Sequence, residues 1–294
     1  MRRAHRLAVL TAAATCVLIV FGGLVTNTGA ALAVPDWPTT FGHNMFLFPW
    51  SQMVGGVFYE HSHRLLGSLV GMLTLALAAV LWRQGGRLRA LGIAAVVAVI
   101  AQGVVGGLRV VLLTDGLAMV HGPLAQGFFA LVVAIALVTS ERMTRPAPAL
   151  DGATRGLTLA AALLVYLQIV FGAFLTHAGR LDLHLIGAFA VFTLVPVVTA
   201  RLRRTGDAVA APAARALLPL LAVQLLLGVG AYLARFSAIW IPGGQVTMLA
   251  LPVAHRVTGA LILAAGVILA VRVMAGLQSA PAPVGSQRAL GIAR

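Results

Sequence analysis

Hydrophobic residues dominate the chain in eight long runs, and short stretches between the runs carry most of the polar positions. A helix needs about 20 mostly apolar residues to cross the hydrocarbon core of a membrane, and each run is about that long. The predicted spans are residues 7–26, 63–82, 90–108, 117–139, 157–176, 183–200, 213–234 and 250–274. The first run is long and no small-residue cleavage site follows it, which favours a retained helix over a signal peptide. The pattern predicts an all-α membrane protein with eight transmembrane helices.

Charged residues are scarce and unevenly placed, and they orient the predicted helices. Of 294 residues, 60% are hydrophobic and 10% are charged, with 21 basic against 7 acidic side chains, and every basic residue is an arginine. Sixteen arginines fall at the termini and in alternate connections, which by the positive-inside rule places both termini in the cytoplasm. The arginines lie between apolar runs rather than on a soluble body, so membrane lipid is the predicted partner and nucleic acid is not.

The sequence also contains an internal repeat. Residues 20–29 (VFGGLVTNTG) return 150 positions later as residues 170–179 (VFGAFLTHAG). Such a repeat predicts two pseudo-symmetric four-helix bundles of the same topology. The predicted parts are an N-terminal half at 1–140 with a long external loop at 27–62, a cytoplasmic linker at 141–156, a C-terminal half at 157–276, and a disordered cytoplasmic tail at 277–294.

Four histidines occupy repeated places near the outer, N-terminal ends of the even-numbered spans: His63, His121, His184 and His255. Ionisable residues in a membrane span are costly and usually functional. Facing helices of a four-helix bundle can present two imidazoles to one central object, such as the iron of a b-type haem. The alternative is four interfacial histidines that bond loop carbonyls. Zinc is disfavoured because no third ligand recurs in both halves.

An arginine follows two of these histidines, in the repeated pattern His-Arg-x-x-Gly at His63-Arg64 and His255-Arg256. An arginine beside a haem ligand can pair with a haem propionate through charge-assisted hydrogen bonds. Snorkelling toward lipid phosphate explains the same placement equally well. Both Arg64 and Arg256 are therefore candidate propionate partners.

One carboxylate distinguishes the two halves. Glu60 precedes His63 by three residues, which puts both on one helix face, whereas Leu181 stands at the matching place before His184. This asymmetry suggests that one half carries out chemistry while the other holds an electron-transfer cofactor. The alternative for Glu60 is a first-turn acid that complements the helix dipole. Two further histidines without repeat mates, His61 and His177, are interpreted as interfacial.

At these residues the chain resembles the haem A synthases, membrane enzymes that convert haem O to haem A. The resemblance rests on the eight spans, the four histidines, Glu60-x-x-His63, and the signature at residues 26–29 followed by Pro35-Asp36-Trp37-Pro38. It implies that His184 and His255 ligate a resident haem b iron. It also implies that His63 and His121 bind the substrate haem, and that Glu60 is needed for catalysis.

Family chemistry implies two successive hydroxylations of a haem methyl to a diol that loses water to a formyl group. It further implies a bacterial inner-membrane location, with the haem sites near the external face. The implied partners are a haem O synthase as substrate donor, cytochrome oxidase assembly factors, an unidentified electron acceptor, and a second copy of the chain. Many bacterial members carry a cysteine pair around the Asp-Trp-Pro segment. This chain lacks that pair, since its single cysteine, Cys16, lies in the first span.

Two other classes of protein remain as alternatives. A two-haem cytochrome b that only transfers electrons usually stacks haems near both membrane faces, whereas all four histidines here are predicted on the external side. That placement and the asymmetry at Glu60 favour an enzyme. A transporter or haem-handling protein needs no redox-active haem and predicts a colourless purified protein.

Overall fold

Eight long helices make up almost all of the computed structural model, which describes residues 1–114, 116–239 and 241–278. The helices are α1 (Arg2–Asn27), α2 (Gly55–Trp82), α3 (Gly86–Val111), α4 (Gly116–Val138), α5 (Gly152–Ala178), α6 (Leu181–Leu202), α7 (Ala210–Phe236) and α8 (Gly244–Gln278). Three 3₁₀ turns, η1 (Met45–Leu47), η2 (Trp50–Gln52) and η3 (Glu141–Thr144), lie in the connections. Each of the eight helices is long and apolar enough to cross a membrane, which confirms the predicted all-α fold.

Most helices extend beyond their predicted bounds, and two of these differences change the connections. The second helix begins at Gly55 rather than 63, so the long loop spans 28–54 and not 27–62. The polar residues before 63 fit inside this helix because the charge of Glu60 is paired with Arg64 one turn later. The last helix runs from Gly244 to Gln278, so the first two residues of the predicted tail are helical. The rest of that tail, 279–294, lies outside the described residues.

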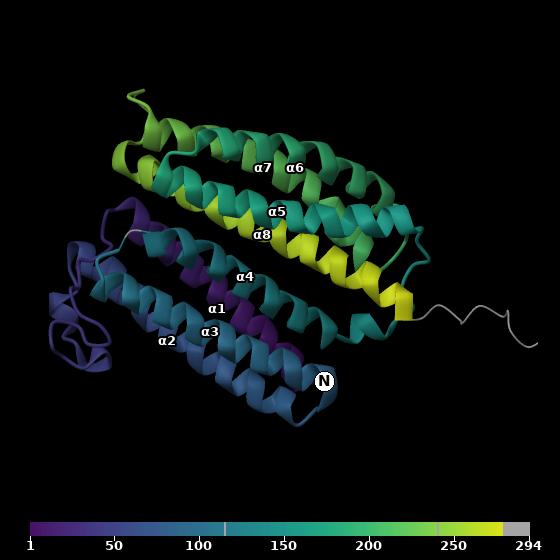
Figure 1. Ribbon diagram of the computed structural model, residues 1–294, viewed down its shortest axis with the longest axis horizontal. Helices are drawn as coiled ribbons and strands as arrows, with labels where there is room; N and C mark the ends of the chain where they lie inside the picture. The colour runs from purple at the N-terminus through teal and green to yellow at the C-terminus, as the bar shows by residue number, and fades with distance from the viewer. Residues whose placement is uncertain (115, 240, 279–294) are drawn as a thin grey trace, which may run out of the picture.

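The helices pack as two groups of four. In the first group α1 contacts α2 and α4, and α3 contacts α2 and α4; the second group repeats this order with α5 to α8. The groups meet through α1, α4, α5 and α8, and Figure 1 shows α8 running along the middle of the molecule. Ile19, Phe129 and Ala260 form a small buried cluster across this boundary. The packing order therefore matches two four-helix bundles, whereas their pseudo-symmetry stays a prediction.

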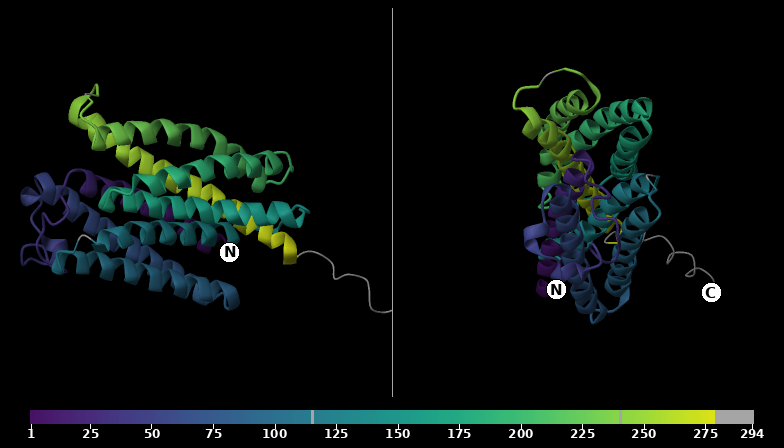
Figure 2. Two further views of the ribbon diagram at one scale, coloured as in Figure 1. Left: turned by 45° about the horizontal axis from the view of Figure 1, so that its top comes forward. Right: turned by 90° about the vertical axis from the view of Figure 1, so that its left-hand side faces the viewer.

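The ends of the molecule carry different features. The N-terminus and the last turns of α8 lie at one end, here called the terminal end, and the loop at 28–54 projects from the opposite, loop end (Figures 1 and 2). The even number of helices accounts for this arrangement. It agrees with both termini facing the same compartment, and their assignment to the cytoplasm stays a prediction.

Large apolar side chains cover the outside of the helices. Phe189 is 77% exposed and Leu226 is 74% exposed, and many aliphatic side chains on other helices are similarly bare. Soluble proteins rarely expose apolar surface on this scale, and the hydrocarbon of a bilayer accepts it without penalty. The chain is a multi-pass membrane protein.

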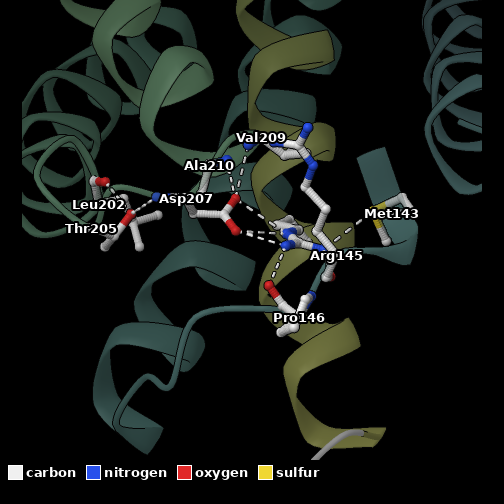
Figure 3. Close-up of polar contacts among 9 residues, drawn as sticks. Met143, Arg145, Pro146, Leu202, Thr205, Asp207, Val209 and Ala210 are labelled. Carbon is white, nitrogen blue, oxygen red and sulfur yellow. Dashed lines mark hydrogen bonds and ion pairs between the residues drawn. The ribbon is translucent and has the colours of Figure 1, made fainter. Parts of the chain in front are cut away.

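A buried ion pair joins the linker between the halves to α8 near the terminal end. Arg272 of α8 is 1% exposed, and its Nη2 lies 2.7 Å from Oδ2 of Asp207. The same guanidinium donates to the carbonyls of Arg145 and Pro146 in the linker, at 3.1 and 2.7 Å. Asp207 also caps α7, because its Oδ1 accepts from the backbone N–H of Ala210 at 2.7 Å (Figure 3). This Arg272–Asp207 pair fixes the linker, α7 and α8 together.

Candidate functional site

The four predicted histidines meet as two pairs, one in each group of helices. The ring centroids of His63 and His121 lie 6.4 Å apart, and those of His184 and His255 lie 6.3 Å apart. A metal midway between two imidazoles, with metal–nitrogen distances of about 2.0 Å, places ring centroids about 6.3 Å apart. Both pairs therefore have the spacing that axial ligation of one iron atom requires.

A glycine on the preceding helix makes room for each imidazole. An alanine Cβ at that glycine would stand close to Cε1 of the histidine: 3.2 Å for Gly22 and His63, 3.0 Å for Gly106 and His121, 3.5 Å for Gly172 and His184, and 3.0 Å for Gly228 and His255. The first and third glycines are matching positions of the sequence repeat. The repeated glycines thus serve to seat the imidazoles, beyond helix packing in general.

Gly228→Ala is expected to displace His255 and to weaken binding of a haem by its pair about tenfold, the lower range for changes beside a metal ligand. The added methyl group would lie 3.0 Å from Cε1 of the imidazole, closer than ordinary contact. Haem retained through purification, measured by absorption, checks this. Gly103→Ala is the control, since nothing lies within 4 Å of its Cβ. Equal haem retention in both variants would contradict the seating role.

The rings of the second pair are held by two glutamines. Nδ1 of His255 lies 3.2 Å from the carbonyl oxygen of Gln224. The amide of Gln168 donates to the carbonyl oxygen of His184 at 2.9 Å and lies 3.2 Å from its Nδ1. Such partners fix ring orientation and tautomer at metal sites. Gln168 was not singled out in the sequence, although it lies one turn before the repeated Gly172.

The first pair is less firmly held. Among the described residues, Nδ1 of His63 and Nδ1 of His121 are buried without a hydrogen-bond partner. The carbonyls of Leu18 and Gln102 lie near these rings but do not reach hydrogen-bond geometry. Unpaired ring nitrogens, the glycine seats and the ring spacing all fit a haem. The two sites differ in their Nδ1 atoms: among the described residues that of His184 lies near the amide of Gln168 and that of His255 near the backbone carbonyl of Gln224, whereas those of the first pair have no partner.

Glu60 and Arg64 hydrogen-bond to each other and to the backbone of the long loop. Glu60 is 5% exposed, and its Oε1 accepts from Nη2 of Arg64 at 2.7 Å while its Oε2 accepts from the N–H of Val34 at 3.0 Å. Arg64 also donates to the carbonyls of Val34, Asp36 and Thr39, at 3.0, 2.6 and 3.0 Å. The first turn of α2 contains no acid, so Glu60 does not cap the helix dipole.

The same loop segment is stabilised by Asp36. Its carboxylate accepts from the N–H groups of Phe41 and Gly42, at 2.7 and 2.9 Å, and from the hydroxyl of Thr39. Burial opposes ionisation and is the largest single effect, but these hydrogen bonds together outweigh it and hold the pKa of Asp36 below its usual value. The ring of Trp37 packs directly on Gly107 of α3, where no Cβ would fit. The loop is thus fixed to both α2 and α3.

The structure places His61 differently from the interfacial position that was predicted from the sequence. It is 1% exposed rather than interfacial, because the loop folds over it. Its Nδ1 lies 3.1 Å from the hydroxyl of Thr40, and the ring of Phe48 packs on it with centroids 5.0 Å apart. His177 lies in the last turn of α5 and is partly buried.

Arg256 differs from Arg64 despite the shared sequence pattern. It is partly buried on α8 and points across the boundary between the halves toward α1. Its Nη1 lies 3.6 Å from the place where a Cβ on Gly23 would stand. The long loop, which occupies Arg64, has no counterpart in the second half. The two candidate propionate partners therefore differ: the loop carbonyls and Glu60 bind Arg64, whereas Arg256 is not bound by the loop.

Comparison with known families decides the relationship. The model of the COX15-CtaA family, described as cytochrome oxidase assembly protein, matches residues 5–180, well over half of the chain. The chain belongs to the COX15-CtaA family. The matched segment contains Glu60, His63 and His121, and it ends before His184. The sequence-based assignment to the haem A synthase family is confirmed by this match.

Individual members of the family agree. The chain is 32% identical over 182 residues to a protein named heme A synthase from Shouchella clausii, covering 59% of each chain. It is 28% identical over 177 residues to a heme A synthase from Alkalihalophilus pseudofirmus, covering 58% of each. A heme A synthase from Bacillus licheniformis is 31% identical over 140 residues, covering 46% of this chain and 45% of that one. The matches thus span less than two thirds of these relatives.

Proposed function

We propose that this protein is a haem A synthase, which oxidises a methyl group of haem O to a formyl group through two successive hydroxylations. The observation that carries the proposal is the presence of two histidine pairs at haem-ligand spacing, only one of which has a carboxylate one turn from a ligand. Membership of a family of cytochrome oxidase assembly proteins supports it. So do the matched relatives named heme A synthase.

The two pairs have different roles in this proposal. His184 and His255 hold a resident haem b, which when bound supplies electron transfer to and from the reaction site. Their orientation by Gln168 and Gln224 suits a permanent cofactor. The amide of Gln224 also lies 3.3 Å from Nε2 of His255, so it has to move aside for a metal. His63 and His121 hold the substrate haem, and their less firmly held rings suit a ligand that enters and leaves.

Glu60 is proposed as the residue that the reaction requires beside the substrate. A carboxylate near the reacting edge can accept a proton or stabilise developing positive charge. Both of its oxygens already accept hydrogen bonds, from Arg64 and from the loop backbone at Val34. Taking a proton would remove the negative charge that strengthens both of these bonds. Any movement of the loop at 28–54 would therefore be coupled to the state of Glu60.

The proposed setting follows from the family. The protein would lie in a bacterial inner membrane with cytoplasmic termini and external haem sites. It would receive haem O from a haem O synthase and act with cytochrome oxidase assembly factors, an electron acceptor and, as a further proposal, a second copy of itself. A two-haem cytochrome b is the second candidate. It is less favoured because both pairs lie on helices that begin at the same, loop end.

Co-expression with a haem O synthase tests the enzyme. Haem A is expected in extracts of cells that carry the wild-type chain, and none is expected with Glu60→Ala or Glu60→Gln. The glutamine variant keeps an oxygen for the N–H of Val34, so its failure would point to the carboxylate itself rather than to loss of the loop contact. Chromatography of the extracted haems is the measurement.

Glu141→Ala is the matched control, because that acid is exposed near the terminal end and its ion pair among the described residues is with the exposed Arg2. It should make haem A at the wild-type level. The proposal is wrong if the wild-type chain makes no haem A under conditions in which a known synthase does.

A further inference from the structure

An arginine without an anionic partner lies at the boundary between the two halves. Arg256 has no hydrogen bond or ion pair to any of the described residues, whereas Arg64, in the same sequence pattern, is bound to a carboxylate and three carbonyls. A cation held inside a membrane protein is costly unless it is paired. The described carboxylates are engaged elsewhere: Asp36, Glu60, Glu141, Asp151, Asp182 and Asp207. Arg256 therefore lacks a counter-ion from its own chain in this part of the structure.

Its position places it between the two histidine pairs. Adjacent residues of α1 contact the two groups: Gly22 seats His63, and Gly23 lies against the guanidinium of Arg256. The guanidinium is close enough to interact electrostatically with His63 of the first pair and with His255, its neighbour on α8. An anion bound by Arg256 would therefore lie beside the proposed haem site at His63 and His121.

Two further donors lie at the same place. Arg235 of α7 is near enough to Arg256 for their charges to interact, and its Nη1 donates to Oδ1 of Asn27 on α1. The amide nitrogen of Asn27, Nδ2, is buried and makes no hydrogen bond to the described residues. Helices α1, α7 and α8 thus bring two guanidinium groups and an unused amide donor near one another, and no carboxylate of the described residues pairs with them.

We propose that Arg256, Arg235 and Asn27 form an anion site at the boundary of the halves, which binds a carboxylate of a bound haem. The inference rests on the proposed function in that the ligand is a haem. Charge-assisted bonds from guanidinium groups to a carboxylate are short and strong, and they stabilise both partners when water is scarce. The contact of Gly22 and Gly23 with His63 and Arg256 favours the haem of the first half. A residue of the second half would then take part in binding the substrate.

The test compares a haem with its neutral ester. Full-length protein in phosphate-free, uncharged detergent is titrated with ferric haem b and with haem b dimethyl ester, and binding is followed by Soret absorbance. The wild type is expected to bind the free acid roughly 10- to 100-fold more tightly, the size of a charge-assisted hydrogen bond. Arg256→Gln should lose most of that preference, and Arg256→Lys should keep part of it. Arg235→Gln should reduce it as a second, independent variant.

Arg180→Gln is the matched control, because it removes the same charge from the exposed pair of Arg180 with Asp182 at the loop end. It should keep the wild-type preference. Repeating the titrations with His63→Ala and with His255→Ala identifies the haem: the preference disappears in the variant that has lost the haem whose carboxylate is bound. The site is supported by either result.

Three results would overturn the anion site. The preference for the free acid could be unchanged in Arg256→Gln, as expected if this arginine serves lipid phosphate. It could be absent in the wild type, or the wild type could bind neither compound. The experiment involves no turnover, so a chain that makes no haem A but loses its preference through Arg256→Gln would reject the enzyme and keep the anion site.

Discussion

Replacing His255 with alanine is expected to remove the proposed resident b-type haem, whereas replacing His63 should leave that haem in place. The two histidines belong to different pairs, separated by the boundary between the groups of helices. If His184 and His255 hold this haem, the alanine variant would keep only one of the two imidazoles that bind its iron. We expect His255→Ala to purify with little haem and without a low-spin spectrum when expressed without a haem O synthase. Reduced-minus-oxidised absorption spectra provide the measurement.

Two comparisons make this result specific. His184→Ala should behave like His255→Ala, because both rings belong to one pair. His43→Ala is the control, since this histidine is exposed in the long loop and belongs to neither pair. An intact b-type spectrum in His255→Ala, or its loss in His63→Ala alone, would show that the resident haem has been assigned to the wrong half.

The sequence predicted the spans and the histidine pairs because both depend on features that repeat. Long apolar runs are visible without any tertiary information, and the four histidines recur at matching places. The start of α2 was missed because hydropathy alone penalises the charges of Glu60 and Arg64. In the folded protein these charges neutralise one another across one helical turn. When two opposite charges one turn apart lie on either side of a predicted helix start, the helix should therefore be extended outward to include both.

The two His-Arg patterns show what a shared short motif cannot reveal. Arg64 and Arg256 both follow a histidine in the pattern His-Arg-x-x-Gly, and both were candidates for the same ligand group, although their helices, α2 and α8, do not correspond in the repeat. The long loop exists only in the first half, and its carbonyls occupy Arg64. Among the described residues, no loop carbonyl binds Arg256, which faces α1 instead. The same short motif therefore has different surroundings on two helices that are not counterparts in the repeat.

This asymmetry also bears on how the proposed chemistry is confined to one half. The first half has Glu60, a fixed loop and Nδ1 atoms without a partner among the described residues, whereas in the second half Nδ1 of His184 lies near the Gln168 amide and Nδ1 of His255 near the Gln224 carbonyl. A firmly oriented ligand pair favours a constant redox centre. A less constrained pair, such as His63 and His121 beside the loop at 28–54, favours exchange of the bound molecule. The shared histidine framework is thus compatible with two different tasks.

Asp207→Asn is expected to destabilise the protein by about 3–5 kcal/mol, the range for removing one partner of a buried ion pair. Asparagine keeps an oxygen for the N–H groups of Val209 and Ala210, so the cap of α7 is preserved. The guanidinium of Arg272, which is 1% exposed, would then be left without its counter-ion. Thermal unfolding in detergent measures the effect, and a helix signal from circular dichroism is a suitable probe. Asp182→Asn, at an exposed pair, should have a much smaller effect.

The same pair predicts how stability depends on pH. Burial tends to raise the pKa of Asp207, but the hydrogen bond from Arg272 and the N–H groups of Ala210 and Val209 outweigh it and lower that pKa below 3.8. A carboxyl group whose pKa is lower in the folded state stabilises the fold above its unfolded pKa. That contribution is complete near neutral pH and is lost as the pH falls below 3.8 through the folded pKa. The difference in unfolding temperature between wild type and Asp207→Asn should therefore be constant from pH 6 to 8 and shrink in acid. A difference that persists unchanged below the folded pKa would mean that Asp207 does not act through its charge.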